Sequence, residues 1–197
     1  MGSLGIVGAI ASGKSTAARW FEARGWAVVD ADTEAHALYA PGSELVAALE
    51  ARFGSGIVRR DGAVDRAALG EIVFADPKAL ADLDALVHPL ARHRIRRAVD
   101  SARSTGADVV LEMALLHRWP EMVSSLDRVL GIRCSDPIRL ERLAGQRGMT
   151  LEQARLRLSA QDQDLLLSVA DVSVPNDGTR RELEERLDEF QLGQKAS

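Results

Sequence analysis

The first residues with an evident chemical role form a glycine-rich loop near the start of the chain. Residues 8–15 read Gly-Ala-Ile-Ala-Ser-Gly-Lys-Ser and fit the pattern G-x-x-x-x-G-K-[ST], whose consecutive backbone N–H groups surround a phosphate. An apolar stretch, Leu4–Val7, precedes the loop, and a stretch with helical character, Thr16–Glu22, follows it. This context disfavours the alternative of a chance turn, because the N-terminus of such a helix adds a positive dipole end. We expect Lys14 to reach the β- and γ-phosphates of a nucleotide, and the Ser15 hydroxyl to ligate Mg²⁺.

Acidic residues follow two later apolar runs. Asp30 and Asp32 come after Ala27–Val29, and Glu112 comes after Val109–Leu111. One carboxylate of the Asp pair is suited to orient or deprotonate an attacking hydroxyl, whereas the alternative is a helix cap. We favour the catalytic role for one of these aspartates for two reasons. Ligands gather at the carboxyl ends of parallel strands, and we expect the strand before Asp30 to lie next to the strand that leads into the phosphate loop. Glu112 stands where such enzymes hold Mg²⁺ with an aspartate. Because its side chain is longer by one methylene, we expect it to fit only through a shifted backbone or a bridging water.

Arginines gather in and around the stretch after the apolar run 128–132: Arg133, Arg139, Arg142 and Arg147. Planar, permanently charged guanidinium groups match the oxygens of a transferring phosphoryl group. For any single arginine a solvated helix face is the simpler interpretation, as for the i,i+3 pair Arg139 and Arg142. We nevertheless expect Arg142 or Arg147 to touch nucleotide phosphates. A second basic run, 92–97, has no interleaved aromatic residues for base stacking and is interpreted mostly as a solvated face.

Composition narrows the class of protein. The chain has 197 residues, of which 46% are hydrophobic and 27% charged, as in ordinary globular domains. Its net charge of −4 gives no general attraction to nucleic acids or anionic membranes. No apolar run is long enough to span a bilayer, and no secretory signal precedes the loop. The single cysteine, Cys134, excludes an internal disulfide and fits a reducing compartment. We therefore expect a cytoplasmic protein. From the net charge and the lack of a long apolar run, we expect no nucleic-acid or membrane partner.

Short apolar runs alternate with longer amphipathic stretches, a pattern typical of an α/β fold with a parallel sheet. The candidate strands lack polar alternation, as expected for strands buried on both faces; they are Leu4–Val7, Ala27–Val29, Val109–Leu111, Arg128–Ile132 and Val172–Val174. The long region between the second and third strands is interpreted as a helical insert and not as an independent folding unit. Its periodicity predicts helices around Leu45–Phe53, around Leu80–Leu86 and from Pro89 to Ala102.

Further short motifs follow along the chain in this order: Pro41-Gly42-Ser43, Val64-Asp65-Arg66, Leu69, Val73-Phe74, His88-Pro89-Leu90, Ala160-Gln161, Ala170-Asp171, Asn176 and Gly178. Together with the loop Gly8–Thr16 and with Asp30-Ala31-Asp32, they cover nearly the whole chain. The combination resembles the dephospho-CoA kinase family. The loop alone is shared by many kinases, whereas the combination with Asp-Ala-Asp, His-Pro and the C-terminal motifs is much more specific.

The resemblance implies a kinase of coenzyme A biosynthesis that transfers the γ-phosphoryl group of ATP, with Mg²⁺, to the ribose 3′-hydroxyl of dephospho-CoA. It implies one P-loop NTPase-type domain over residues 1–197, with a five-stranded parallel sheet flanked by helices. The expected core is about 1–40 and 105–192. A helical substrate-binding insert is expected at about 41–104, and a helical lid at about 136–165.

The resemblance also implies residue roles. Asp32 is the candidate base, Lys14 holds phosphates, Arg142 belongs to the lid, and Ser15 with Glu112 would hold the metal. Asn176 would lie near the adenine. The nucleotide-binding set implied in this way is Gly8, Ala11, Ser12, Gly13, Lys14, Ser15, Thr16, Arg147 and Asn176.

The chain departs from the family pattern at several places. Ala9 and Ala11 replace usual glycines, and a left-handed backbone at Ala11 would cost roughly 1–2 kcal/mol. Glu112 replaces an aspartate, Arg118 stands where the family has an acid, and the second lid arginine is displaced by one residue to Arg147. Two alternatives therefore stay open: a nucleotide- or CoA-binding homologue with impaired catalysis, and another small-metabolite kinase of the phosphate-loop type.

Overall fold

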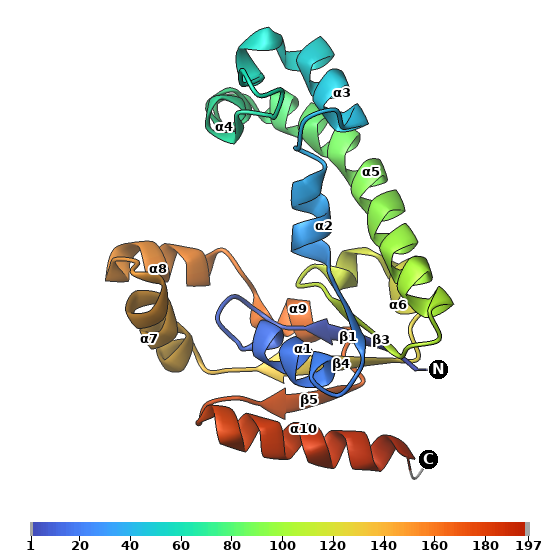
Figure 1. The fold of residues 1–197 in the computed structure, drawn as a ribbon. Helices are drawn as coiled ribbons and strands as arrows, with labels where there is room; N and C mark the ends of the chain where they lie inside the picture. Colours follow the sequence, from blue (N-terminus) through green and yellow to red (C-terminus); the bar gives the residue numbers. More distant parts are fainter. Residues whose placement is uncertain (1, 196–197) are drawn as a thin grey trace. The chain divides into compact units, whose positions relative to one another are not determined.

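The computed structural model describes residues 2–195, apart from the side chains of residues 146, 147 and 193–195. Five parallel strands form one sheet: β1 (Ser3–Val7), β2 (Ala27–Asp30), β3 (Val109–Glu112), β4 (Arg128–Arg133) and β5 (Val172–Pro175). Each strand lies where the sequence predicts it and is longer by a residue at one end. The predicted α/β fold with a five-stranded parallel sheet is therefore confirmed (Figure 1).

The spatial order of the strands is β2-β3-β1-β4-β5. β1 pairs with β3, where Gly5 is opposite Leu111, and with β4, where Gly5 is opposite Val129. The expectation that β2 neighbours the strand of the phosphate loop is therefore wrong. The connection from β1 to β2 passes over one strand position, which β3 later fills. Both strands on that side of β1 end in an acidic residue, β2 in Asp30 and β3 in Glu112.

The chain forms short and long helices in this order: α1 (Lys14–Glu22), α2 (Ala31–Ala37), α3 (Glu44–Phe53), η1 (Ser55–Ile57), α4 (Arg66–Ala75), α5 (Pro77–Ser104), η2 (Leu116–Arg118), α6 (Pro120–Val123), α7 (Asp136–Arg147), α8 (Leu151–Ser159), α9 (Gln163–Leu167) and α10 (Arg180–Lys195). The chain divides into two compact units, Met1–Val29 with Ala102–Ser197, and Asp30–Ser101. Within the described residues, no helix is both long and apolar enough to cross a membrane.

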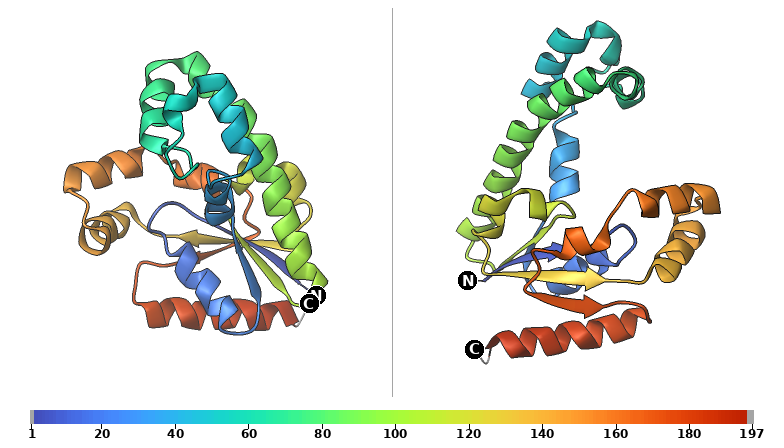
Figure 2. Two further views of the ribbon diagram at one scale, coloured as in Figure 1. Left: turned by 45° about the horizontal axis from the view of Figure 1, so that its top comes forward. Right: turned by 180° about the vertical axis from the view of Figure 1, so that it is seen from behind.

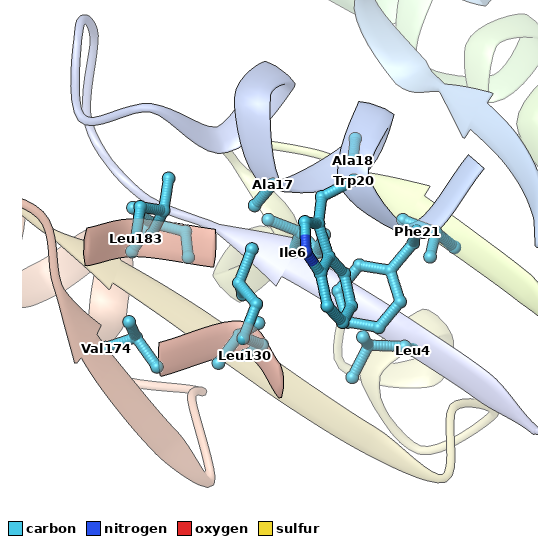
Figure 3. Packing of buried hydrophobic residues seen from close by; sticks show 12 residues of the cluster. Leu4, Ile6, Ala17, Ala18, Trp20, Phe21, Leu130, Val174 and Leu183 are labelled. Carbon is cyan, nitrogen blue, oxygen red and sulfur yellow. The ribbon is translucent and has the colours of Figure 1, made fainter. Parts of the chain in front are cut away.

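The first unit has a hydrophobic core between the sheet and the helices α1 and α10 (Figures 2 and 3). The buried side chains of this cluster come from β1, β3, β4, β5 and the two helices: Leu4, Ile6, Ala17, Ala18, Trp20, Phe21, Val110, Leu130, Ile132, Val174, Leu183 and Leu187. Gly5 faces the other side of β1, where a Cβ would meet Leu116 and Leu126. Burial on both faces explains why β1 carries no polar alternation.

The second unit is helical, with α3 and α4 beside the first half of α5 (Figure 2). The sequence predicts two helices around Leu80–Leu86 and Pro89–Ala102, and this prediction is wrong, because α5 is one helix of 28 residues that contains Pro89. A proline inside a helix removes one hydrogen bond and crowds the preceding turn. The helix nevertheless continues and buries Ala91, Ile95 and Val99 beyond the proline, which offsets that cost.

Candidate active site

The phosphate loop connects the buried strand β1 to the first turn of α1. At Gly8 a Cβ would lie 2.6 Å from the Ile132 carbonyl oxygen and 2.6 Å from Ser12 Oγ, so only glycine fits there. Ala11 has φ 60°, which makes it the one non-glycine residue with a left-handed backbone among those described. The loop therefore adopts at Ala11 the conformation that glycine tolerates best, with a side chain present.

The N-terminus of α1 begins at Gly13, which has a left-handed backbone and no side chain to cap the helix. The Thr16 N–H, in the first turn, donates to the Gly13 carbonyl at 3.0 Å. Lys14 Nζ donates to the Ala9 carbonyl at 3.3 Å, so the ammonium group lies against its own loop. A helix N-terminus beside a lysine and a curled backbone is an anion site.

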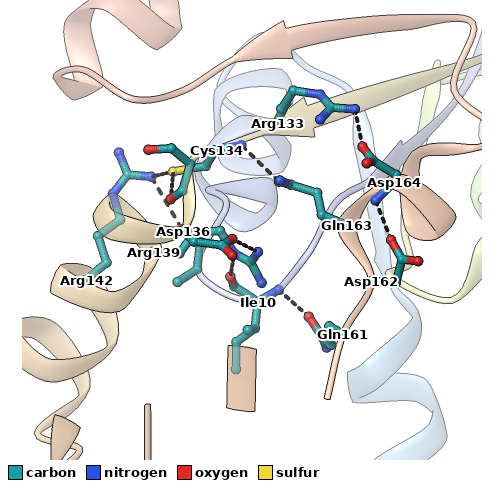
Figure 4. A network of polar contacts seen from close by, with 12 residues as sticks. Ile10, Arg133, Cys134, Asp136, Arg139, Arg142, Gln161, Asp162, Gln163 and Asp164 are labelled. Atoms are coloured by element: carbon teal, nitrogen blue, oxygen red, sulfur yellow. Dashed lines mark hydrogen bonds and ion pairs between the residues drawn. The ribbon is translucent and has the colours of Figure 1, made fainter. Parts of the chain in front are cut away.

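Three side chains from the C-terminal half donate to backbone carbonyls of the loop, and Figure 4 shows two of them, Arg139 and Arg142. Arg139 Nε donates to the Ile10 carbonyl at 3.0 Å, and Arg142 Nη1 donates to the Ala11 carbonyl at 3.3 Å. Asn176, itself buried, donates from Nδ2 to the Ser12 carbonyl at 2.7 Å, and Ser12 is fully buried. These contacts join α7 and the residue after β5 to consecutive peptide groups of the loop.

Arg139 is only 1% exposed, so its interpretation as part of a solvated helix face is wrong. Leu143, four residues later on the same face of α7, is fully buried, and this spacing is the sequence signal that would have placed Arg139 inside. Arg142 is also held: its Nη2 donates to the Asn176 carbonyl at 2.9 Å and to the Gly178 carbonyl at 3.3 Å. Gln161, to which the sequence analysis assigns no role beyond its motif, accepts a hydrogen bond from the Ile10 N–H at 2.7 Å.

The two residues predicted to hold the metal lie together. The Ser15 hydroxyl donates to Glu112 Oε1 at 2.7 Å, which joins the first turn of α1 to the end of β3. Glu112 therefore reaches the serine directly despite its extra methylene. Among the described residues, no group of three or more His, Cys, Asp and Glu side chains could hold a metal without other ligands.

In the second unit, the two aspartates of Asp-Ala-Asp have different environments. Asp30 is the N-cap of α2, where its Oδ1 accepts the N–H of Asp32 at 2.9 Å and that of Thr33 at 3.3 Å. The capping alternative therefore applies to Asp30. Asp32 is exposed in the first turn of α2, and its carboxylate has no hydrogen bond or ion pair within the part of the chain that the structure describes.

Some neighbouring groups have shifted pKa values. Burial raises the pKa of the Cys134 thiol to about 11, and Arg142 Nη1 lies 3.3 Å from its sulfur. The pKa of Asp177 is lowered because its carboxylate accepts the Ser135 N–H at 2.7 Å. Burial lowers the pKa of His117 in η2, whose buried Nδ1 has no hydrogen-bond partner among the described residues. The side chain of Arg147, predicted to bind nucleotide, lies outside the described part of the chain.

Comparison with known proteins assigns the chain to a protein family. The sequence model of the dephospho-CoA kinase family (CoaE) matches residues 3–182. The chain belongs to the dephospho-CoA kinase family. A dephospho-CoA kinase from Thermobifida fusca (strain YX) is 38% identical over 187 residues, which cover 94% of this chain and 92% of that protein. One from Geobacillus kaustophilus (strain HTA426) is 37% identical, also over 187 residues, with coverage of 94% and 92%.

A solved structure shares the fold. The dephospho-CoA kinase from Campylobacter jejuni has a TM-score of 0.67 to this chain at 24% identity, over 97% of this chain and 96% of that one. Membership of the dephospho-CoA kinase family makes the chain an ATP-dependent phosphotransferase of coenzyme A synthesis. The resemblance stated from the sequence is thereby confirmed over nearly the whole chain.

Proposed function

We propose that this member of the dephospho-CoA kinase family binds ATP at the loop 8–13 and the start of α1, and uses Asp32 as the base. The observation that carries the proposal is the hydrogen bond of 2.7 Å between Ser15 Oγ and Glu112 Oε1 at the helix N-terminus. It places a hydroxyl and a carboxylate, the oxygen ligands suited to a phosphate-bound divalent cation, beside the anion site.

The loop amides and Lys14 hold the polyphosphate in this proposal. The N-terminal amides of α1 and the curled backbone donate to phosphate oxygens, and the ammonium group adds a positive charge. Lys14 Nζ, which contacts the Ala9 carbonyl, exchanges that neutral acceptor for anionic oxygens. Positioning and charge stabilisation are the main contributions a protein makes to phosphoryl transfer.

Ser15 and Glu112 would hold Mg²⁺. The donor set fits, because both side chains offer oxygen and because this cation commonly takes its other ligands from phosphates and water. When bound, the ion would neutralise charge on the phosphate oxygens. We expect Glu112→Gln to raise the Mg²⁺ concentration needed for half-maximal rate. The same exchange at the exposed Glu121, Glu121→Gln, should leave that concentration unchanged.

Asp32 is the carboxylate of the pair that the helix cap does not use. It accepts the proton of the ribose 3′-hydroxyl while that oxygen attacks the γ-phosphorus, and ADP leaves with the electrons of the broken bond. The roles of Arg142 and Arg147 at the phosphates and of Asn176 near the adenine stay predictions. So do the substrate-binding role of the insert, the lid role of about 136–165 and the cytoplasmic location.

A coupled assay of ADP release with dephospho-CoA tests the proposal. We expect Lys14→Ala and Asp32→Asn each to lower kcat by at least about 100-fold, the scale of a lost electrostatic clamp or proton acceptor. Asp30→Asn is the matched control for Asp32→Asn, because asparagine caps a helix as well as aspartate does, and we expect it to retain most of the rate. A near-wild-type rate for Asp32→Asn would overturn its role.

An acceptor panel separates the alternatives. Tight ATP binding without turnover of any acceptor would indicate a homologue with impaired catalysis. Turnover of another small alcohol in preference to dephospho-CoA would indicate a different kinase of the phosphate-loop type.

A further inference from the structure

Consecutive carbonyl groups of the phosphate loop are each bound by a different side chain. The carbonyls of Ile10, Ala11 and Ser12 accept hydrogen bonds from Arg139, Arg142 and Asn176 at 3.0, 3.3 and 2.7 Å respectively. Loop carbonyls at a surface usually bond to water, so three successive side-chain partners indicate that the orientation of these peptide groups is fixed by the protein.

Fixing a carbonyl also fixes an amide. In a trans peptide the C=O of one residue and the N–H of the next point in opposite directions. The three held carbonyls therefore set the directions of the N–H groups of Ala11, Ser12 and Gly13. The Ser12 N–H donates to the Ala9 carbonyl at 3.2 Å, whereas the Ala11 and Gly13 N–H groups have no acceptor in the described part of the chain. The Ala11 N–H therefore points away from Arg139 and the Gly13 N–H away from Asn176, and both donors are left for a ligand.

Of the three side chains that bind these carbonyls, Arg139 is the one whose burial lowers the folding stability. Its side chain is 1% exposed, Nη1 pairs with Asp136 Oδ1 at 2.7 Å, and Nη2 has no partner among the described residues. A buried guanidinium with an unmet donor costs folding free energy, so its presence is not explained by stability. Its Nε contact, with the Gln161 contact on the N–H of the same residue, holds Ile10 at both its backbone groups.

We propose that Arg139 is a positioning residue for ATP binding, which through the Ile10 carbonyl orients the loop amides toward the polyphosphate. The inference rests on the proposed role of these amides. It differs from a direct attraction between the arginine and phosphates, because the contact that matters is a single N–H donor on a backbone carbonyl.

Two substitutions separate these possibilities. The amide nitrogen of glutamine lies as many bonds from Cα as Nε of arginine, so Arg139→Gln can keep the donor to Ile10 while it removes the charge. Methionine has a similar length and carries a methyl group at that place, so Arg139→Met removes both. Leu143→Ala is the matched control for loosening of α7, since Leu143 is fully buried in the same helix and donates nothing to the loop.

The experiment is calorimetric titration of each variant with ADP and with AMP, without acceptor, followed by steady-state kinetics. We expect Arg139→Met to weaken ADP binding by about 10- to 100-fold, the change that corresponds to one lost charge-assisted hydrogen bond, with little effect on AMP. We expect Arg139→Gln to bind ADP within about threefold of the unaltered protein, well inside the change that a lost bond would give. In kinetics, Arg139→Met should raise the KM for ATP and leave that for dephospho-CoA unchanged.

The outcomes are distinct. Equal losses of ADP affinity in the Gln and Met variants would overturn the proposal in favour of simple charge. A loss in Leu143→Ala as large as in Arg139→Met would overturn it in favour of general loosening of the helix. Equal binding of ADP and AMP by the unaltered protein would overturn the proposed function of the loop, and this inference with it.

Discussion

Exchange of Ala11 for glycine should make this protein more stable, against the usual effect of glycine. Ala11 has φ 60°, and a side chain in that region costs roughly 1–2 kcal/mol. Glycine removes that strain but adds backbone freedom to the unfolded chain, which costs about 0.5–1 kcal/mol. The expected net gain in unfolding free energy for Ala11→Gly is therefore about 0.5–1 kcal/mol.

Ala9→Gly is the matched control, in the same loop and also at a usual glycine position of the family. Ala9 is fully buried and is not among the residues with positive φ. Glycine there loses a buried methyl group and gains unfolded-state freedom, so we expect a loss of about 1–2 kcal/mol.

Thermal unfolding followed by circular dichroism, without nucleotide, measures both. For a chain of this size 1 kcal/mol shifts Tm by about 2–4 °C, so the Tm values of the two variants should differ by roughly 3–12 °C, with Ala11→Gly above the unaltered protein. A fall in Tm for Ala11→Gly that matches the fall for Ala9→Gly would refute the idea that the loop carries strain at residue 11.

Other perturbations follow from the same contacts. Gly13→Ala should abolish measurable ADP binding and lower Tm, because its Cβ would lie 2.1 Å from Asn176 Nδ2, whereas Gly145→Ala, in open space on α7, should stabilise by about 0.5–1 kcal/mol. Cys134, buried with a pKa of about 11, should react with a thiol reagent at pH 8 only after denaturation, since about a thousandth of it is thiolate. Burial lowers the pKa of His117 in the folded protein, so the unfolded chain binds a proton there at a higher pH than the folded chain does. The free energy of unfolding therefore falls as the pH drops through the ordinary histidine range. In urea unfolding, His117→Gln should lose less of this free energy between pH 7.5 and 5.5 than the unaltered protein does.

The strands and the phosphate loop were predictable because their signals are local. Buried parallel strands are continuous apolar runs, and the loop needs a fixed set of residue types at fixed spacing. The strand order was not predictable in the same way, because pairing of β1 with β3 joins residues 106 positions apart, such as Ser3 and Val109. Pro89 misled the helix prediction, since its local cost is outweighed by burial along the rest of α5.

The candidate site shows the same division. Ser15 and Glu112 could be proposed as partners because both stand at element ends that a parallel sheet brings to one edge. The role of Arg139 could not be seen from its type, because arginine is usually exposed and the acceptor is a backbone carbonyl of Ile10, 129 residues away. Only the periodicity of α7 pointed inward at that position.

The strand order also has a consequence for synthesis on the ribosome. The middle strand of the sheet leaves the ribosome first, but the two segments that flank it come more than 100 residues later. The continuous helical unit Asp30–Ser101, by contrast, is complete before either of them is made. In a nascent chain, β1 and the phosphate loop after it should therefore stay without their lateral strand partners until translation is past its midpoint.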